Sequence, residues 1–392
     1  MTHLLLTLAG AVLAGITLPL VLELLMVTAA DLLPSGAGVR PAPAAQSPPQ
    51  LAIVVPAHNE ALLVDRAVRS LRASAHPGVR IYVVAHNCSD TTAARAEAAG
   101  AEALVYNDST AKGKGFALRY GFKHALAAGA GAVMVVDADS TVSANTVAEV
   151  EQAFAAGARV VQCRYEMFST TEKSSTRLAA LAFRGFNVVR PRGRERLGCS
   201  AGILGNGFAI LRPVLEAIPY DTFSVVEDLE YHLHLVMAGE RVRYLDDALI
   251  SAEFPESKAG ESVQRSRWEG GRLLTARTWA LPIAARILRG RLRLLEPLCD
   301  LTGLPLAYGV FALLLALCLP LGWLRWYAAI SLLIVAAHVL VAAWSGPDFL
   351  KTLRLLALAP FYILRKLAMI PGVLRGSSAK AAWVRTERDN TL

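Results

Sequence analysis

Residues 4–30 constrain the fold of this chain more than any other stretch of its sequence. The segment is almost entirely apolar and contains one ionisable side chain, Glu23. A helix of this length can cross a lipid bilayer. A cleaved signal peptide is the alternative, but such peptides usually begin with a basic region and have a shorter apolar core, whereas this chain begins MTHLLL. We therefore predict an N-terminal transmembrane helix at 1–30.

The composition indicates a membrane protein with one large domain. The chain has 392 residues, of which 54% are hydrophobic, and a mean hydropathy of +0.41, which is too apolar for an ordinary soluble protein. Its cysteines are odd in number and include no CxxC pair: Cys88, Cys163, Cys199, Cys299 and Cys318. This pattern argues against a disulfide framework or a zinc site and fits a reducing compartment.

Short apolar runs alternate with helical stretches after a Pro/Ala-rich linker at 31–49. The runs at 51–57, 79–85 and 132–138 have the pattern of buried parallel strands, each followed by polar residues and an Ala-rich helix. Such alternation predicts an α/β sheet with right-handed crossovers, and we expect this domain to cover 50–275. Because ligands bind beyond the carboxyl ends of such strands, the segments PAHNE, HNCSD and DADS should meet at one pocket.

The C-terminal third predicts further membrane association. We expect interfacial amphipathic helices at 276–300, a transmembrane hairpin at 301–345, an interfacial or re-entrant helix at 346–374, and a cytoplasmic tail at 375–392. A full span at 346–374 is the alternative. The predicted topology has the N-terminus outside, and the large domain and the tail inside.

Basic residues gather next to the apolar C-terminal segments. Between residues 265 and 293 there are eight arginines and one acidic residue, Glu269. Arginine beside membrane segments marks the cytoplasmic side and attracts anionic head groups. Nucleic-acid binding is the competing interpretation of a net charge of +8. No nucleic-acid motif accompanies the charge, so we predict membrane lipids as partners and no nucleic acid.

Two acidic motifs carry the expected chemistry. Asp137 and Asp139 follow a strand and share one face of the extended chain, so together they can hold a hard divalent cation. Asp228 opens a helix predicted to end near Gly239. A helix N-terminus stabilises the carboxylate, so we expect the pKa of Asp228 not to be raised. Solvated loop acids and a plain helix cap are the structural alternatives.

A third motif, QRSRW, supplies Gln264, Arg267 and Trp268. Their i, i+3, i+4 spacing places all three on one face of a helix. Arg267 suits bidentate pairing with a diphosphate, and Trp268 offers a flat surface to a sugar ring. An interfacial Trp-Arg anchor is the alternative interpretation.

The ordered set PAHNEA, AKGKGFAL, VVDADS, LGNGFAI, VVEDLEY and QRSRW resembles the membrane-bound family 2 glycosyltransferases over about residues 50–275. The resemblance implies an α/β GT-A (Rossmann-like) catalytic domain with N- and C-terminal transmembrane and interfacial helices. It implies an inverting transferase that uses Mg or Mn and moves a hexose from a nucleotide sugar, with UDP as the expected nucleotide. Asp228 would be the catalytic base, and Asp139 and Asp137 would bind the metal.

The resemblance also assigns binding residues. The expected nucleotide-sugar contacts are Pro56, His58, Glu60, Asp90, Lys114, Asp137, Asp139, Gln264 and Arg267, and the expected acceptor contacts are Cys199, Asn206 and Trp268. The chain departs from the family at the end of its second strand, where acidic residues usually read the base. His86 and Asp90 are the candidates to substitute there, so the nucleotide stays open.

The acceptor is predicted at the membrane. We expect addition to a lipid-linked acceptor or other glycan in exopolysaccharide or envelope glycan synthesis, in a bacterial inner membrane with the catalytic domain in the cytoplasm. A processive polysaccharide synthase, a ceramide-glucosyltransferase-like enzyme and an inactive nucleotide-sugar-binding scaffold are alternatives. A homo-oligomer and polysaccharide-assembly partners stay open. An ionisable group at membrane depth usually has a partner, so Glu23 should face the C-terminal helices or the acceptor path.

Overall fold

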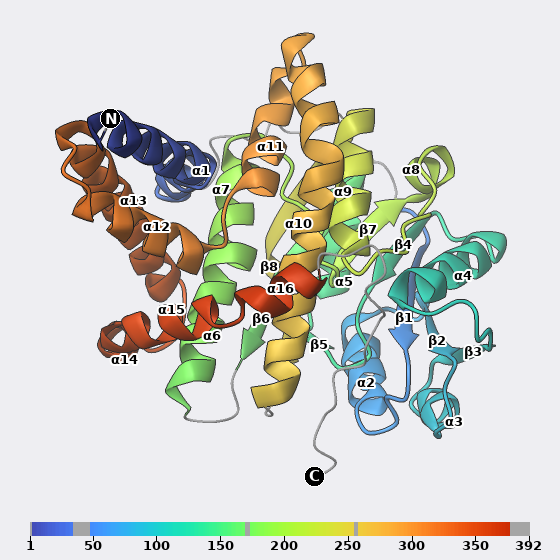
Figure 1. The fold of residues 1–392 in the computed structure, drawn as a ribbon. Helices are drawn as coiled ribbons and strands as arrows, with labels where there is room; N and C mark the ends of the chain where they lie inside the picture. The colour runs from blue at the N-terminus through green and yellow to red at the C-terminus, as the bar shows by residue number, and fades with distance from the viewer. Residues whose placement is uncertain (1, 34–47, 169–172, 255–257, 377–392) are drawn as a thin grey trace. The chain divides into compact units, whose positions relative to one another are not determined.

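The computed structural model describes residues 2–33, 48–168, 173–254 and 258–376 (Figure 1). The chain divides into two compact units. The helical unit comprises residues 1–37, 171–199 and 255–392, and the sheet unit comprises residues 38–170 and 200–254. This division differs from the domain expected at 50–275, because residues 171–199 and 255–275 are grouped with the helices.

The sheet unit is built on eight strands in the order β3-β2-β1-β4-β7-β6-β8-β5. The three predicted strands are present as β1 (Leu51–Ala57), β2 (Arg80–His86) and β4 (Ala132–Val135), and they pair in parallel. The other strands are β3 (Glu102–Tyr106), β5 (Thr141–Val142), β6 (Val160–Phe168), β7 (Phe208–Leu211) and β8 (Val242–Glu253). β7 runs antiparallel to β4 and β6, so the sheet is mixed.

Helices cover both faces of this sheet. Alternate residues of each central strand point to opposite faces, so each strand contributes apolar side chains to both. Ile53 and Val55 pack with the apolar side chains of α2 (Val64–Ser74), α3 (Thr92–Ala98) and α5 (Thr146–Ala155). Ala52 and Val54 pack with α4 (Lys114–Ala127), α8 (Arg212–Ala217) and α9 (Glu227–Ala238). The two cores leave the polar residues that follow β1, β2 and β4 at the carboxyl edge of the sheet.

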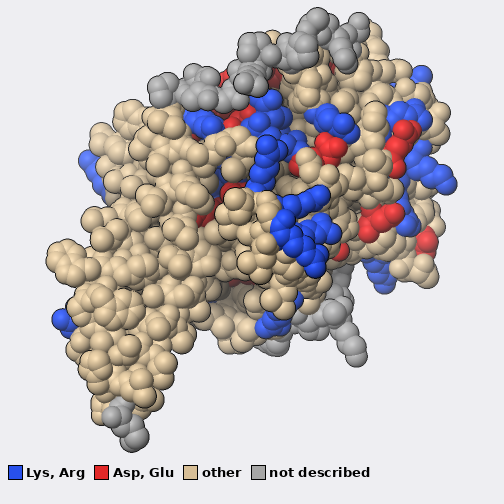
Figure 2. Space-filling view, turned by 90° about the horizontal axis from the view of Figure 1, so that it is seen from above, with Lys and Arg blue, Asp and Glu red and all other residues tan. Residues whose placement is uncertain are grey.

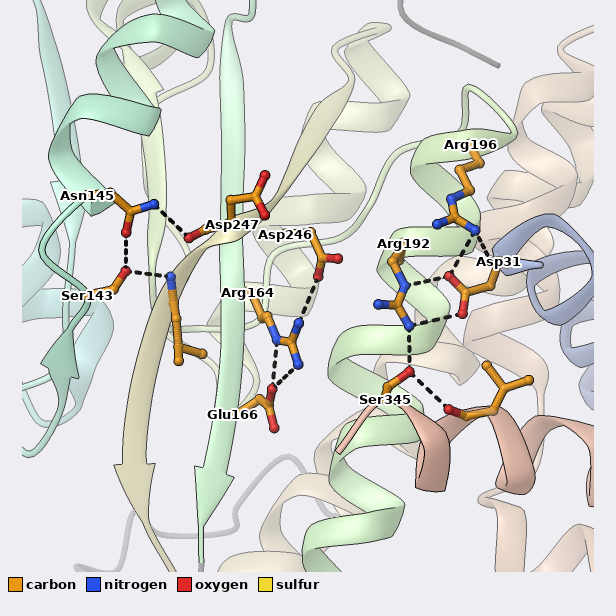
Figure 3. Close-up of polar contacts among 12 residues, drawn as sticks. Asp31, Ser143, Asn145, Arg164, Glu166, Arg192, Arg196, Asp246, Asp247 and Ser345 are labelled. Carbon is orange, nitrogen blue, oxygen red and sulfur yellow. Dashed lines mark hydrogen bonds and ion pairs between the residues drawn. The ribbon is translucent and has the colours of Figure 1, made fainter. Parts of the chain in front are cut away.

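Polar contacts support the far half of the sheet, where β6 and β8 pair in parallel with a register shift between Cys163 and Arg164 (Figure 3). Arg164 Nε donates to Glu166 Oε1 at 2.7 Å, and its Nη1 lies 3.4 Å from Asp246 Oδ1 on β8. Nearby, Asn145 Nδ2 donates to the carbonyl oxygen of Asp247 at 3.0 Å. These bonds tie β6 to β8 at the register shift and tie β8 to the start of α5.

The helical unit begins with α1 (Thr2–Asp31) and continues with a nearly unbroken helix from residue 174 to residue 196. A π-helical turn, Gly185–Val189, separates α6 (Ser174–Arg184) from α7 (Arg190–Arg196). The remaining helices are α10 (Lys258–Leu288), η2 (Leu292–Leu294), α11 (Leu295–Thr302), α12 (Leu306–Cys318), α13 (Gly322–Trp344), α14 (Phe349–Leu355), η3 (Leu356–Leu358), α15 (Ala359–Leu367) and α16 (Ile370–Gly376).

Two of these helices, α1 and α13, are long and apolar enough to cross a membrane. In Figure 2, the side of the molecule that carries them shows few charged side chains. The predicted hairpin does break between α12 and α13, but α12 has 13 residues and is about 20 Å long, too short to span alone. It reaches spanning length only together with η2 and α11, to which it is bent by 83°. The stretch at 349–376 consists of helices of nine residues or fewer.

α1 and α7 approach each other closely within the helical unit. A Cβ atom at Gly193 would lie 2.1 Å from the carbonyl oxygen of Val27, so only glycine allows this packing. At the end of α1, the carboxylate of Asp31 accepts hydrogen bonds from Arg192 at 2.5 Å (Nε to Oδ1) and 3.0 Å (Nη2 to Oδ2) (Figure 3). Arg192 also donates to Ser345 Oγ at 2.6 Å, which ties both helices to the residue after α13.

Glu23 on α1 has buried partners, as the sequence predicts. The side chains that contact it directly lie on α7. Its Oε1 accepts from Arg194 Nη2 at 2.6 Å, and its Oε2 lies 3.3 Å from Arg190 Nη1. The same arginines reach α11, where Arg194 Nη2 lies 3.1 Å from Asp300 Oδ1 and Arg194 also pairs with Glu296. The helix-bundle network, as we call this set, consists of Glu23, Arg190, Arg194, Arg272, Glu296 and Asp300.

Candidate active site

The first part of the site is a repeated Ala-His-Asn at the ends of β1 and β2. Ala57 and Ala85 are register partners, so the two tripeptides lie side by side. Asn59 and Asn87 both adopt positive φ, 55° and 52°. Asparagine tolerates this left-handed conformation better than most residues. The sharp turn after each strand therefore turns an asparagine amide sideways, toward the next strand end.

These amides link the three strand ends in series. Asn59 Oδ1 accepts from the backbone N–H of Ser89 at 2.7 Å. Asn87 Oδ1 accepts from the N–H of Asp108 at 2.8 Å, and its Nδ2 donates to the carbonyl oxygen of Asp108 at 2.9 Å. His58 Nδ1 lies 2.8 Å from the carbonyl oxygen of His86. The edge formed by β1, β2 and β3 is thus held by His58, an expected nucleotide-sugar contact, and by Asn59 and Asn87, which were not among the predicted site residues although the repeated HN dipeptide was a visible signal.

Asp90 contributes to the same frame. Its Oδ2 accepts from the N–H of Ala61 at 3.1 Å, and its Oδ1 accepts from the N–H of Thr92 at 3.0 Å. Thr92 Oγ1 in turn accepts from the N–H of Glu60 at 2.9 Å. Pro56 lies in β1 opposite Val84. Because both carboxylate oxygens of Asp90 hold backbone turns, its geometry favours a positioning role over direct reading of a nucleobase.

The acidic segment after β4 is held by Asn206. The N–H of Asp137 donates to Asn206 Oδ1 at 3.0 Å, and Asn206 Nδ2 donates to Ser140 Oγ at 2.8 Å. Ser140 Oγ donates to Asp139 Oδ1 at 3.1 Å. Asn206 is only 1% exposed. Its amide therefore positions the acidic pair, which leaves little support for the predicted contact between Asn206 and an acceptor.

A buried glutamine supports Asn206 from β6. Gln162 Nε2 donates to the carbonyl oxygen of Asn206 at 2.7 Å, and its Oε1 accepts from the N–H of Leu204 at 2.9 Å. Gln162 was not among the predicted site residues. A single polar residue within a strand gives no signal of its own, because its partners lie about forty positions further along the chain.

Lys114 joins the acidic segment to the start of α9. Its ammonium pairs with Asp137 and also donates to the carbonyl oxygen of Gly205 at 2.5 Å. Gly205 has a φ of +77°, and a Cβ atom there would lie 2.8 Å from Asp228 Oδ2. The predicted metal-binding carboxylates, the predicted base and the lysine therefore meet at one edge of the sheet. We call Lys114, Asp137, Asp139, Glu227 and Asp228 the catalytic-edge cluster.

Burial perturbs the ionisation of this cluster. Loss of hydration raises the pKa of Asp228, which corrects the expectation that the helix N-terminus would keep it low. Burial and the neighbouring Asp228 raise the pKa of Glu227 to about 8. The pKa of Asp137 is also raised by burial, although Lys114 opposes that shift. For Lys114 burial lowers the pKa, but Asp137 and Glu227 outweigh it, so the pKa is raised and the ammonium form is retained.

Comparison with known proteins identifies the family. Residues 48–271 match the family described as glycosyltransferase like family 2, which is more than half of the chain. The chain belongs to this family of glycosyltransferases. A probable glycosyltransferase, YdaM, from Bacillus subtilis (strain 168) is 25% identical over 236 residues, or 57% of this chain. The match covers 55% of that relative's length.

A solved structure confirms the GT-A fold of the transferase. The mannosyltransferase PcManGT from Pyrobaculum calidifontis, in complex with GDP-Man and Mn²⁺, aligns with a TM-score of 0.58 and 18% identity. The alignment covers 96% of this chain and 99% of that one. The predicted α/β GT-A class is thereby confirmed, and the family match confirms the predicted family 2 glycosyltransferase.

The carboxylates of this glycosyltransferase fit a divalent cation that is shared with a substrate. Among residues 2–33, 48–168, 173–254 and 258–376, no group of three or more His, Cys, Asp or Glu side chains could hold a metal on its own. Mg²⁺ usually binds through one or two carboxylates plus substrate phosphates rather than in an all-protein cage. Asp137 and Asp139, held on one loop, match that donor set.

The other predicted residues of the transferase lie in the helical unit. Arg267 and Trp268 are on α10, where Trp268 is 37% exposed. Gln264 belongs to the same helix, but its side chain lies outside the described residues. Cys199 follows α7, and its N–H donates to the carbonyl oxygen of Arg194 at 2.9 Å. The helical placement of QRSRW is confirmed, whereas the meeting of these residues with the catalytic-edge cluster stays a prediction.

Proposed function

We propose that this glycosyltransferase moves a hexose from a nucleotide sugar to a lipid-linked acceptor, with inversion at the transferred carbon. The observation that carries the proposal is the convergence on Lys114, which pairs with Asp137 and bonds the carbonyl of Gly205, the residue against Asp228. A base and a cation at one sheet edge are the parts that this transfer needs. The groups come from three separate segments, namely the loop after β4 and the starts of α4 and α9.

Asp228 is the proposed base. It would take the proton of the acceptor hydroxyl while that oxygen bonds to the sugar carbon and the bond to the diphosphate breaks. Its raised pKa makes it a stronger base than an exposed aspartate, because a buried carboxylate gains more from binding a proton. Lys114, and by family resemblance Arg267, would stabilise the charge that develops on the leaving diphosphate. A divalent cation held by Asp137 and Asp139 would add to that stabilisation.

The membrane segments support an acceptor at the lipid surface. α1 and α13 are candidate spans in the same chain as the catalytic-edge cluster. The turn after α10 exposes Leu288 and Leu292 beside Arg289 and Arg291, a composition that suits an anionic interface. We infer a cytoplasmic catalytic unit in a bacterial inner membrane and a role in envelope or exopolysaccharide synthesis.

Single addition is favoured over processive synthesis. A conduit for a polymer must shield sugar hydroxyls from hydrocarbon, where unpaired polar groups are costly. Two candidate spans, or three if the bent pair counts as one, are few for that purpose among the described residues. The donor nucleotide needs a direct test, because the carboxylate of Asp90 holds backbone turns and the Pyrobaculum enzyme was solved with GDP-Man.

The proposal is tested with purified full-length protein, radiolabelled UDP- and GDP-sugars, extracted bacterial lipids, and Mg²⁺ or Mn²⁺. We expect label in a lipid-extractable product and its loss in Asp139→Asn. The matched control is Asp247→Asn, since Asp247 is an exposed carboxylate of the sheet unit. A long insoluble polymer would overturn single addition, and no transfer from any donor would overturn the proposal.

A further inference from the structure

The ammonium of Lys114 occupies one of the two carboxylates that suit a divalent cation. Lys114 lies at the first position of α4, between Gly113 and Gly115, and its Nζ pairs with Asp137 Oδ1. Both side chains are only partly exposed, 23% for Lys114 and 29% for Asp137. Limited solvent contact makes this attraction stronger than that of a surface pair.

Two acceptors hold the Lys114 ammonium in place. It pairs with Asp137 and donates to the carbonyl oxygen of Gly205, a bond that requires an N–H donor. An ammonium ion and a divalent cation are both attracted to the same carboxylate. A carboxylate oxygen that accepts from the ammonium is a poorer metal ligand, and the positive charge also repels the incoming ion.

We propose that Lys114 is a built-in competitor of the metal at Asp137, so that the metal binds tightly only together with the diphosphate of the donor. The inference rests on the proposed function in one respect: the donor must carry a diphosphate. The diphosphate offers the ammonium a new anionic partner and gives the metal additional oxygen ligands. Metal and nucleotide then strengthen each other's binding by the same factor, since such coupling is reciprocal.

The test measures Mn²⁺ binding to the full-length protein in detergent by electron paramagnetic resonance, with no nucleotide, sugar or acceptor present. We expect Lys114→Met to bind Mn²⁺ about tenfold more tightly than the unchanged protein, because one charge beside the site is removed. Lys112→Met is the matched control. It removes the same charge from an exposed side chain two residues away, and its Mn²⁺ affinity should stay unchanged.

A second titration adds UDP or GDP. We expect the nucleotide to raise the Mn²⁺ affinity of the unchanged protein about tenfold, and that of Lys114→Met by much less. Lys114→Arg keeps the charge and should behave as the unchanged protein. If Lys114→Met does not fold, as judged by thermal unfolding, Lys114→Gln, which also removes the charge, is titrated in its place with the same expected results.

Three results would overturn the inference: Mn²⁺ binding by Lys114→Met that is no tighter than that of Lys112→Met, no coupling between Mn²⁺ and either nucleotide in the unchanged protein, or no Mn²⁺ binding at all. None of these readouts uses sugar transfer. Failure of the lipid-transfer assay with intact metal–nucleotide coupling would instead count against the proposed acceptor.

Discussion

The two charged clusters of this protein differ in balance. The helix-bundle network sets three arginines against three carboxylates, and its closest contacts include 2.6 Å between Arg194 and Glu23 and 2.7 Å between Arg272 and Asp300. The catalytic-edge cluster sets one lysine against four carboxylates. Burial raises the pKa values of Asp137, Glu227 and Asp228, and neighbouring carboxylates add to the shifts of Asp137 and Glu227.

The difference distinguishes charges that stabilise the fold from charges that take part in binding and catalysis. Buried charges are stable where each has an opposite partner, and the helix-bundle network meets that condition while joining α1, α7, α10 and α11. A cluster with surplus carboxylates is costly to bury, so it suits a site that binds cations and protons. Removing a charge should therefore cost stability in the first cluster and activity in the second.

The largest expected effect is on catalysis. Asp228→Asn should lower kcat/KM about 10³-fold, because a general base typically contributes 10²–10⁴-fold and the amide cannot accept the proton. The melting temperature should not fall, because the variant removes a carboxylate whose burial raises its pKa. Kinetics and thermal unfolding of the same preparation test both parts. A large drop in melting temperature would contradict the assignment of Asp228 to chemistry.

Arg194→Met should have the opposite effect, a loss of stability. It leaves Glu23, Glu296 and Asp300 short of a partner, and breaking a buried ion pair costs about 3–5 kcal/mol. We expect little folded protein, measured as the monodisperse fraction and melting temperature in detergent. Arg293→Met, an exposed arginine of the same unit, is the control and should be neutral. If Arg194→Met were as stable as this control, the helix-bundle network would not be what holds these helices.

Local patterns in the sequence predict much of this fold. The apolar runs at 51–57, 79–85 and 132–138 become β1, β2 and β4, and the helix from Asp228 toward Gly239 becomes α9. The division into units was not predictable in the same way. Residues 174–196 are helical, and only tertiary contacts such as Gly193 on Val27 group them with α1 and the C-terminal helices.

The sequence predicts which residues carry the chemistry of the site, but not which residues position them. Asp137, Asp139, Asp228 and Lys114 stand in motifs whose order points to one reaction. Gln162 gave no such signal, and Asn206 was expected to contact the acceptor, because the supporting roles of both depend on partners from distant strands. The pKa of Asp228 was mispredicted for a related reason: the helix N-terminus is visible in the sequence, whereas the burial that outweighs it is not.

The smallest expected effect is a pH-dependent change in the melting temperature of a Glu227 variant. Its pKa is about 8 in the folded protein and about 4.5 when unperturbed, so the folded state binds the proton more tightly than the unfolded state. The stability that this carboxyl contributes is therefore full below about pH 4.5 and is lost as the pH rises to about 8. Glu227→Gln cannot ionise and escapes that loss, so its melting temperature should exceed that of the unchanged protein by about 2–4 °C at pH 8.5.

At pH 4.5 the two proteins should melt together, and Glu97→Gln, an exposed position on α3, should show no difference at either pH. The scans are run with a chelator, because a bound divalent cation would compensate the same negative charge and hide the effect. A Glu227→Gln variant that was less stable at pH 8.5 would mean that its carboxylate is paired there as tightly as those of the helix-bundle network. Glu227 would then be a paired structural charge, and the proposed difference between the two clusters would not hold for it.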